Sequence, residues 1–220
     1  MDKKKKIIII SVVSLVIIAL IVGLIIFFVT RNNNGEEART IASNSSKIAK
    51  LYDDLNKEQS FSFTTTLDDN NKEIYAKNGN TAYTDTIYDG EESKFIIRDG
   101  NSYLLRDSDK VYYTYQNNEV NLNKVLEQLS EIKDTELVEG KEEVEGKNYN
   151  YEEYTGITNF AIKLTDENNS ENVKTRFYFD GNDLVYIKTI VENSQELLRV
   201  EISNDVDSNL FEIPNDYVSR

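Results

Sequence analysis

The feature that most constrains this 220-residue chain is an uncharged run of 23 residues near its start. From Ile7 to Val29, nineteen residues are Ile, Val, Leu or Phe. Because an α-helix rises about 1.5 Å per residue, the run is about 35 Å long and crosses a hydrocarbon core of about 30 Å with some tilt. In lipid such a segment satisfies its main-chain hydrogen bonds only as a helix. We therefore predict a transmembrane helix over residues 7–29.

The residues around this run predict its orientation. Four lysines, Lys3 to Lys6, precede it directly, and positive residues stay on the cytoplasmic side. The run exceeds the 7–15 apolar residues of a secretory signal, and no small-x-small cleavage site follows it. We therefore predict a single-pass, uncleaved signal-anchor in a cell membrane. Residues 1–6 are expected to be a cytoplasmic stub, residues 30–38 a polar stalk and residues 39–220 an extracytoplasmic domain.

Charge limits the partners of the outer domain. The chain has 25 basic and 39 acidic residues, and removing the four lysines and one aspartate of the stub leaves 21 and 38, a net charge of −17. Nucleic-acid binding depends on Lys and Arg that neutralise phosphates, so we expect no nucleic-acid partner. The expected partners are the membrane through the anchor, a lipid or acylated protein, and a second membrane protein.

The chain has few side chains that are suited to catalysis. The chain contains no His and no Cys, which excludes Ser-His-Asp and Cys-His catalysis and any His-ligated zinc. Acid pairs such as Glu152-Glu153 would lie on opposite faces of a strand. The aspartates in the predicted loops are residues that commonly form turns, and none of these loops has the twelve-residue pattern of a calcium-binding loop. We therefore expect no catalytic residues, no metal site, no cofactor and no enzymatic activity.

The rest of the chain alternates between two periodicities. Apolar residues at helical spacing predict helices over Ala38–Gln59 and Glu119–Lys133. Alternation with period two predicts a strand over residues 61–67. Further strands are expected at residues 81–88, 94–98, 102–106, 111–115, 136–144, 149–154, 159–164, 173–180, 184–191 and 196–203, with Leu210–Pro214 closing the chain.

The turns between these strands predict their arrangement. Asn78-Gly79, Asp89-Gly90 and Asp99-Gly100 tolerate the positive φ angles of tight hairpins. Short strands joined by such turns form an antiparallel meander, and lone amphipathic helices must bury their apolar stripes on it. The predicted class is α+β: a curved antiparallel sheet covered on one face by two helices.

Aromatic residues concentrate in the predicted strands, and the chain has fourteen Tyr and nine Phe. Ordinary sheet packing explains such residues. A curved sheet whose helices stand to one side also makes a concave apolar cleft with room for an acyl chain. The inward-facing positions that would line this cleft, and that are equally expected of a plain core, are Phe63, Phe95, Ile97, Tyr113, Phe177, Phe179, Val200 and Ile202.

The order of these elements resembles bacterial LolA-like and LppX-like lipoprotein-carrier domains over roughly residues 45–217. The supporting motifs are Gly140–Gly146 followed by Tyr149-Asn-Tyr151, the hairpin around Gly181–Leu184, and the terminal segment Leu210–Tyr217. The resemblance implies an unclosed half-barrel with helices over its opening, binding acyl chains in a bacterial cell envelope. It transfers no ligand residue, because shape and apolarity define that family's cleft.

Two functions follow as hypotheses. The first is a membrane-tethered domain that binds a lipid or lipoprotein. An uncleaved anchor and the lack of a lipidation cysteine argue against a carrier that diffuses between membranes. The alternative is a sensory or scaffolding ectodomain that binds a protein or cell-wall component without a lipid. An open apolar cleft favours the first hypothesis, and a cleft filled by helix side chains favours the second.

Overall fold

The computed structural model describes residues 39–42, 45–116, 124–156, 158, 160–164 and 173–220, all within one unit, Arg39–Arg220. The predicted stub, transmembrane helix and stalk lie outside the described residues. Among the residues that the structure describes, no helix is long and apolar enough to span a membrane.

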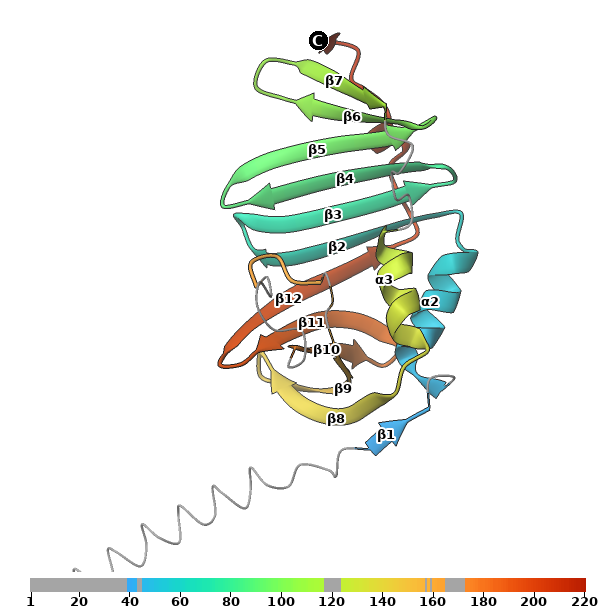
Figure 1. The fold of residues 1–220 in the computed structure, drawn as a ribbon, viewed down its shortest axis with the longest axis vertical. Helices are drawn as coiled ribbons and strands as arrows, with labels where there is room; N and C mark the ends of the chain where they lie inside the picture. Colours follow the sequence, from blue (N-terminus) through green and yellow to red (C-terminus); the bar gives the residue numbers. More distant parts are fainter. Residues whose placement is uncertain (1–38, 43–44, 117–123, 157, 159, 165–172) are drawn as a thin grey trace, which may run out of the picture. The chain divides into compact units, whose positions relative to one another are not determined.

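The described strands form one large sheet (Figure 1). Its order is β1-β8-β9-β10-β11-β12-β2-β3-β4-β5-β6-β7-β13, and only the β13–β7 pair is parallel. The strands are β1 (Arg39–Ile41), β2 (Ser60–Asp68), β3 (Asn71–Asn78), β4 (Thr81–Tyr88), β5 (Glu91–Arg98), β6 (Asn101–Arg106), β7 (Val111–Gln116), β8 (Leu137–Val144), β9 (Lys147–Thr155), β10 (Val173–Asp180), β11 (Asp183–Val191), β12 (Ser194–Ser203) and β13 (Val218–Ser219). Because β1 and β13 are the two ends of this order, the sheet is unclosed, as the predicted class requires.

Tight turns set the register of the β2–β7 meander. The dipeptides Asp89-Gly90 and Asp99-Gly100 have φ values of 50° and 83°, and of 52° and 73°. Positive φ at both central residues matches the right-handed twist of the flanking strands. The predicted hairpins at these turns are therefore confirmed.

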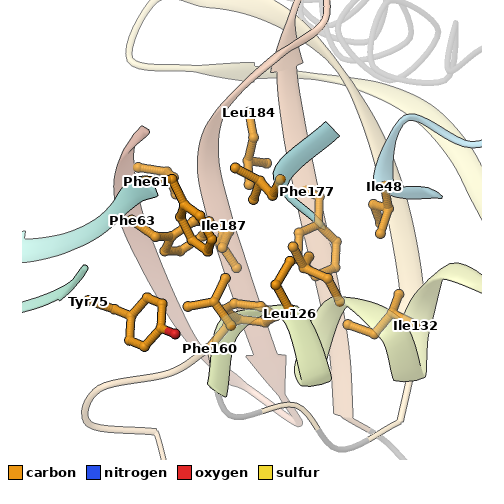
Figure 2. Close-up of a cluster of buried hydrophobic side chains, with 14 of the residues drawn as sticks. Ile48, Phe61, Phe63, Tyr75, Leu126, Ile132, Phe160, Phe177, Leu184 and Ile187 are labelled. Atoms are coloured by element: carbon orange, nitrogen blue, oxygen red, sulfur yellow. The ribbon is translucent and has the colours of Figure 1, made fainter. Parts of the chain in front are cut away.

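Two helices cover one face of the sheet and lie against each other (Figure 1). They are α2 (Lys47–Lys57) and α3 (Lys124–Lys133). Ser46 caps α2, since its Oγ accepts the main-chain N–H of Ala49 at 2.9 Å. Figure 2 shows Leu126 and Ile132 of α3 facing Phe177 and Ile187 of the sheet. We call this buried set, built from both helices and the sheet, the inner cluster. Its buried members are Ile48, Leu55, Phe61, Phe63, Tyr75, Ala82, Val125, Leu126, Leu129, Ile132, Leu137, Phe160, Phe177, Phe179, Leu184, Ile187 and Val200.

The opposite face of the meander is covered by the C-terminal segment. Neighbouring residues of β3 point to opposite faces, so Tyr75 belongs to the inner cluster while Ala76 faces outward. Phe211, in the short helix η3 (Ser208–Phe211), is 5% exposed and packs in the same cluster as Ala76. The end of the chain therefore closes a second, smaller core.

Several predicted boundaries were wrong. The first helix starts at Lys47 rather than Ala38, because Arg39–Ile41 pairs with β8 as a strand. The second begins at Lys124 among the described residues, and residues 119–123 lie outside them. Strand β3 was missed altogether.

The predicted strand at residues 159–164 was also wrong over its described part, residues 160–164, and Glu196 explains why. The carboxylate of Glu196, which is 5% exposed, accepts main-chain N–H groups from Ile162, from Lys163 at 2.8 Å and from Leu164 at 2.9 Å. N–H groups held by one carboxylate cannot serve a strand ladder. The segment is therefore irregular and brings Phe160 into the inner cluster.

Replacing Glu196 with glutamine should lower the free energy of unfolding by about 2 kcal/mol. The amide keeps one acceptor oxygen but sets an NH₂ group against N–H donors, in a buried site where bonds to a charged group are strong. Thermal unfolding of the full chain in mild detergent would measure the loss. The control is Glu201→Gln, an exposed position of the same strand, where the change should stay within about 0.5 kcal/mol. Equal losses in the two variants would mean that the hydrogen bonds to the Glu196 carboxylate do not stabilise the fold.

Candidate functional site

The structure divides the eight predicted cleft positions into two groups. Six lie in or against the inner cluster beside the helices: Phe63, Phe177, Phe179 and Val200 are buried there, and Ile97 and Ile202 are partly buried. Phe95 and Tyr113 lie farther along the same face, because the register joins Phe63, Tyr75, Thr84, Phe95, Leu104 and Tyr113 in one row across β2–β7. Both are half-buried and lie outside the inner cluster. The role of all eight as ligand contacts stays a prediction.

Among the residues that the structure describes, the inner face beneath the helices is closely packed. Phe160 meets Phe177 edge-on, with ring centroids 5.6 Å apart, and lies 6.1 Å from Phe63. The cavity lined by Phe63, Tyr75, Val125 and Phe160 has a volume of only about 20 Å³. That is room for about one water molecule, so an acyl chain does not fit there while α3 stays in place.

A much larger hollow lies where the sheet splits. The pairing of β11 with β12 ends at Tyr186 and Arg199. Both strands continue beyond that point, because β11 begins at Asp183 and β12 stays paired with β2 as far as Ser203. Figure 1 shows the two strands diverging toward the side where α2 lies. We call the hollow between their separated ends and α2 the split groove.

The split groove has a cavity volume of about 810 Å³. Its apolar lining comes from both faces of the sheet. Leu184 belongs to the inner cluster, whereas Val185 packs with Tyr178 and Tyr186 on the opposite face. The groove therefore passes into the plane of the sheet. The apolar residues along it are Leu51, Leu55, Leu184, Val185, Val200 and Ile202. Two of them, Val200 and Ile202, were predicted cleft positions.

A bulge lies beside the split. Between Tyr178 and Phe179 the register of β10 with β11 shifts by one residue, so that Tyr178 pairs with Tyr186 while Phe179 pairs with Leu184. An extra residue bends and twists the strand that carries it. Beyond the shift, the start of β11 is no longer paired with β12, which keeps an unbroken register with β2 from Arg199 to Ser203. No pattern in the sequence marks this bulge.

Helix α2 is held against the groove by a buried carboxylate. Glu152, which is 2% exposed, accepts the main-chain N–H groups of Lys47 at 2.6 Å and Ile48 at 3.0 Å. Burial raises the pKa of Glu152, and the two N–H donors offset part of that rise. Lys47 Nζ also donates to the carbonyl of Gly181 at 2.5 Å, beside the ring of Phe179. These contacts fix α2 to β9 and to the β10–β11 turn.

Glu152 was missed as a functional residue, although its orientation followed from the strand period. Its neighbour Glu153 points the other way and binds Arg176 at 2.7 Å and Lys174 at 3.0 Å. This places the adjacent acids on opposite faces, as predicted. Helix start signals lie in the local sequence, but a capping group from a distant strand has no local signal.

The rim of the split groove is mainly acidic. Its lining includes the carboxylates of Asp54, Glu58, Asp183, Glu201 and Asp205. The bases along it are Lys47 and Lys50. Among the described ranges, no group of three or more His, Cys, Asp or Glu side chains is placed to hold a metal ion. The expectation that the chain is not an enzyme stays a prediction.

Comparison with known proteins adds one structural likeness. No protein-family model matches the sequence, and no curated protein matches it. Among solved structures, the chain is similar to the crystal structure of LprF from Mycobacterium bovis, over 78% of this chain and 96% of that chain. The identity is 12% and the TM-score 0.42, values at which neither a family nor a ligand carries over.

Proposed function

We propose that this protein is a membrane-tethered, extracytoplasmic domain that binds a lipid or an acylated protein. The observation that carries the proposal is the split groove. Its volume of about 810 Å³ lies within the range of about 300–1,000 Å³ that is typical of ligand sites. Its apolar residues continue into the inner cluster through Leu55, Leu184 and Val200, so an acyl chain would extend an existing apolar surface.

Burial of an acyl chain in the groove would favour binding. Each buried methylene contributes about 0.8 kcal/mol, so eight of them contribute about 6 kcal/mol before the costs of association. The groove is open, so the ligand can enter without displacing α2 or α3. The 30–38 stalk, at no more than about 3.6 Å per residue, would hold the domain within roughly 30 Å of the membrane. Membrane lipid would then be within its reach.

One observation favours the alternative of a sensory or scaffolding ectodomain. Among the described residues, the part of the interior lined by Phe63, Tyr75 and Phe160, where the half-barrel families imply an acyl chain, keeps a cavity of only about 20 Å³. A filled interior fits a domain that presents its surface to a protein or to cell-wall material. A sensor of this kind would need a membrane partner, because a six-residue cytoplasmic stub is too short to signal alone.

Photo-crosslinking tests lipid binding on the full chain. The chain would be placed in nanodiscs that contain a trace of phospholipid with a diazirine at the end of its acyl chain. We expect crosslinked peptides from residues 182–185 and 200–205. A charge on the groove wall, Ile202→Glu, should reduce these crosslinks about tenfold or more, because it opposes apolar burial.

Two further variants complete the experiment. Val218→Glu places the same charge on an exposed residue at β13 and should leave the crosslinks unchanged. Leu51→Ser changes the groove from the α2 side and should reduce them even if Ile202→Glu fails to fold. Crosslinks confined to residues 7–29, with none in the groove, would overturn lipid binding and favour the alternative.

A further inference from the structure

The split groove combines apolar side chains with main-chain groups of β12 that have no partner on β11. In an antiparallel ladder the N–H and C=O groups of every second residue point to the same neighbouring strand. Strands β11 and β12 are joined by a two-residue turn between Val191 and Ser194, so the main chains of Leu198, Val200 and Ile202 point toward β11. The pairing with β11 ends at Arg199. Ile202 therefore directs its main chain into the groove rather than to a β11 partner.

The unpaired main-chain groups of β12 favour one kind of ligand over another. A bare hydrocarbon chain lying along them would take N–H and C=O groups out of water without giving them a partner. An extended peptide would supply the missing partners, as a strand does when it adds to the edge of a sheet. Its alternate side chains would meet the apolar residues Leu184, Val185 and Val200. The geometry thus favours a peptide strand over an acyl chain alone.

The charge of the rim narrows the choice further. Four of its acids, Glu58, Asp183, Glu201 and Asp205, form no ion pair with another residue that the structure describes. Of the two lysines, Lys47 already donates to the carbonyl of Gly181. The potential in the groove is therefore negative, and a cationic partner is attracted while an anionic one is repelled.

We infer that the split groove binds an extended peptide segment carrying Lys or Arg, which adds as a strand beside β12. The inference rests on the proposed function in using the same groove. It specifies that the acylated protein is recognised through its peptide, and that the acyl chain adds affinity to a contact made by the main chain.

A peptide series tests the inference on the full chain in nanodiscs of uncharged phosphatidylcholine. The parent probe is a fluorescent ten-residue peptide of alternating Thr and Val with three Lys. A second probe has N-methyl groups on every residue, so that neither edge of the peptide carries N–H donors; a third has Glu for Lys, and a fourth is the parent with an N-terminal lauroyl chain. Lauric acid alone is tested by displacement. Fluorescence anisotropy measures binding, with empty nanodiscs as the blank.

The expected order follows from the contacts. The parent binds, the N-methyl probe binds about tenfold more weakly because it lacks N–H donors, and the Glu probe binds more weakly still. The gap between the Lys and Glu probes narrows in 0.5 M salt, because the rim charges are exposed. The lauroyl peptide binds more tightly than either the parent peptide or lauric acid.

A matched pair of variants separates the groove from the overall charge. The variant D183N/E201Q/D205N removes three charges from the rim, and E91Q/D99N/E143Q removes three exposed charges elsewhere. We expect the first to weaken binding of the Lys probe about tenfold and the second by less than about twofold. Equal effects would show attraction to the whole domain and overturn the site.

The remaining outcomes are distinct. Equal binding of the parent and N-methyl probes would overturn strand addition. Lauric acid binding as tightly as the lauroyl peptide would overturn peptide recognition, while the proposed lipid binding would stand. Peptide binding without lipid crosslinks in the groove would support the inference and remove the lipid from the proposed function.

Discussion

Replacing Phe177 with alanine should lower the free energy of unfolding by about 3–5 kcal/mol. Phe177 is fully buried, packs edge-on against Phe160 and lies near α3 in Figure 2. Removing its ring leaves a cavity among side chains that cannot close up, and it removes an edge-to-face contact with Phe160. Thermal or denaturant unfolding of the full chain, with tyrosine circular dichroism as the signal, would measure the loss.

The control is Phe95→Ala on the same face of the sheet. Phe95 is half-buried and outside the inner cluster, so less apolar surface is exposed and no closed cavity forms. We expect a loss of about 1 kcal/mol there. Similar losses at both positions would mean that the inner face is packed throughout. A larger loss for Phe177→Ala than for Phe95→Ala would show that the inner face of the sheet is less tightly packed around Phe95 than beneath the helices.

The second large effect is expected at Glu142, on the outer face. Its carboxylate accepts hydrogen bonds from Arg176 at 2.6 Å, Tyr178 at 2.6 Å and Lys188 at 2.7 Å. Burial alone would raise the pKa of Glu142, but the bonds from Lys188, Tyr178 and Arg176 lower it to about 2. Because the pKa is lower in the folded than in the unfolded chain, the ionised group stabilises the fold above about pH 4.5.

This stabilisation, up to about 3 kcal/mol, should be lost as the pH falls from about 4.5 to about 2. The Glu142→Gln variant should be less stable by that amount at pH 7 and nearly equal to the parent at pH 2. Unfolding midpoints across this pH range would show the convergence. The control, Glu143→Gln, changes an exposed neighbour and should follow the parent at every pH. A constant difference between Glu142→Gln and the parent would contradict the assignment.

The hairpins were predictable because their signals are local. Asp89-Gly90 and Asp99-Gly100 carry both the turn and the register within a few residues. Strand β3 was missed because it is covered on both faces, with Tyr75 inward and Ala76 outward, so no simple apolar alternation marks it. Residues 159–164 have the alternation of a strand, but the carboxylate of the distant Glu196 binds their N–H groups instead.

The candidate site was predicted only in part, for the same reason. The inward-facing positions Val200 and Ile202 follow from the strand period, and both line the groove. The groove itself depends on the bulge at Tyr178 and on the contact of Glu152 with α2. The contact of Glu152 with α2 joins distant segments, which a pattern in one stretch of sequence does not contain, and the bulge lies within the β10–β11 hairpin but has no residue pattern that marks it. The contribution of α2 through Leu51 was therefore not predicted.

The strand order has a consequence for how the domain folds. Strands β2 to β7 can pair with their neighbours as soon as they are made, whereas β2 gains its other neighbour only when β12 arrives. Pairing between such distant segments is slow, because a long loop must be closed first. Until then β2 presents an open edge, with Phe61 and Phe63 beside it, that can pair with another chain. During folding the domain would thus be most prone to aggregation just before its last long strand, β12, pairs with β2.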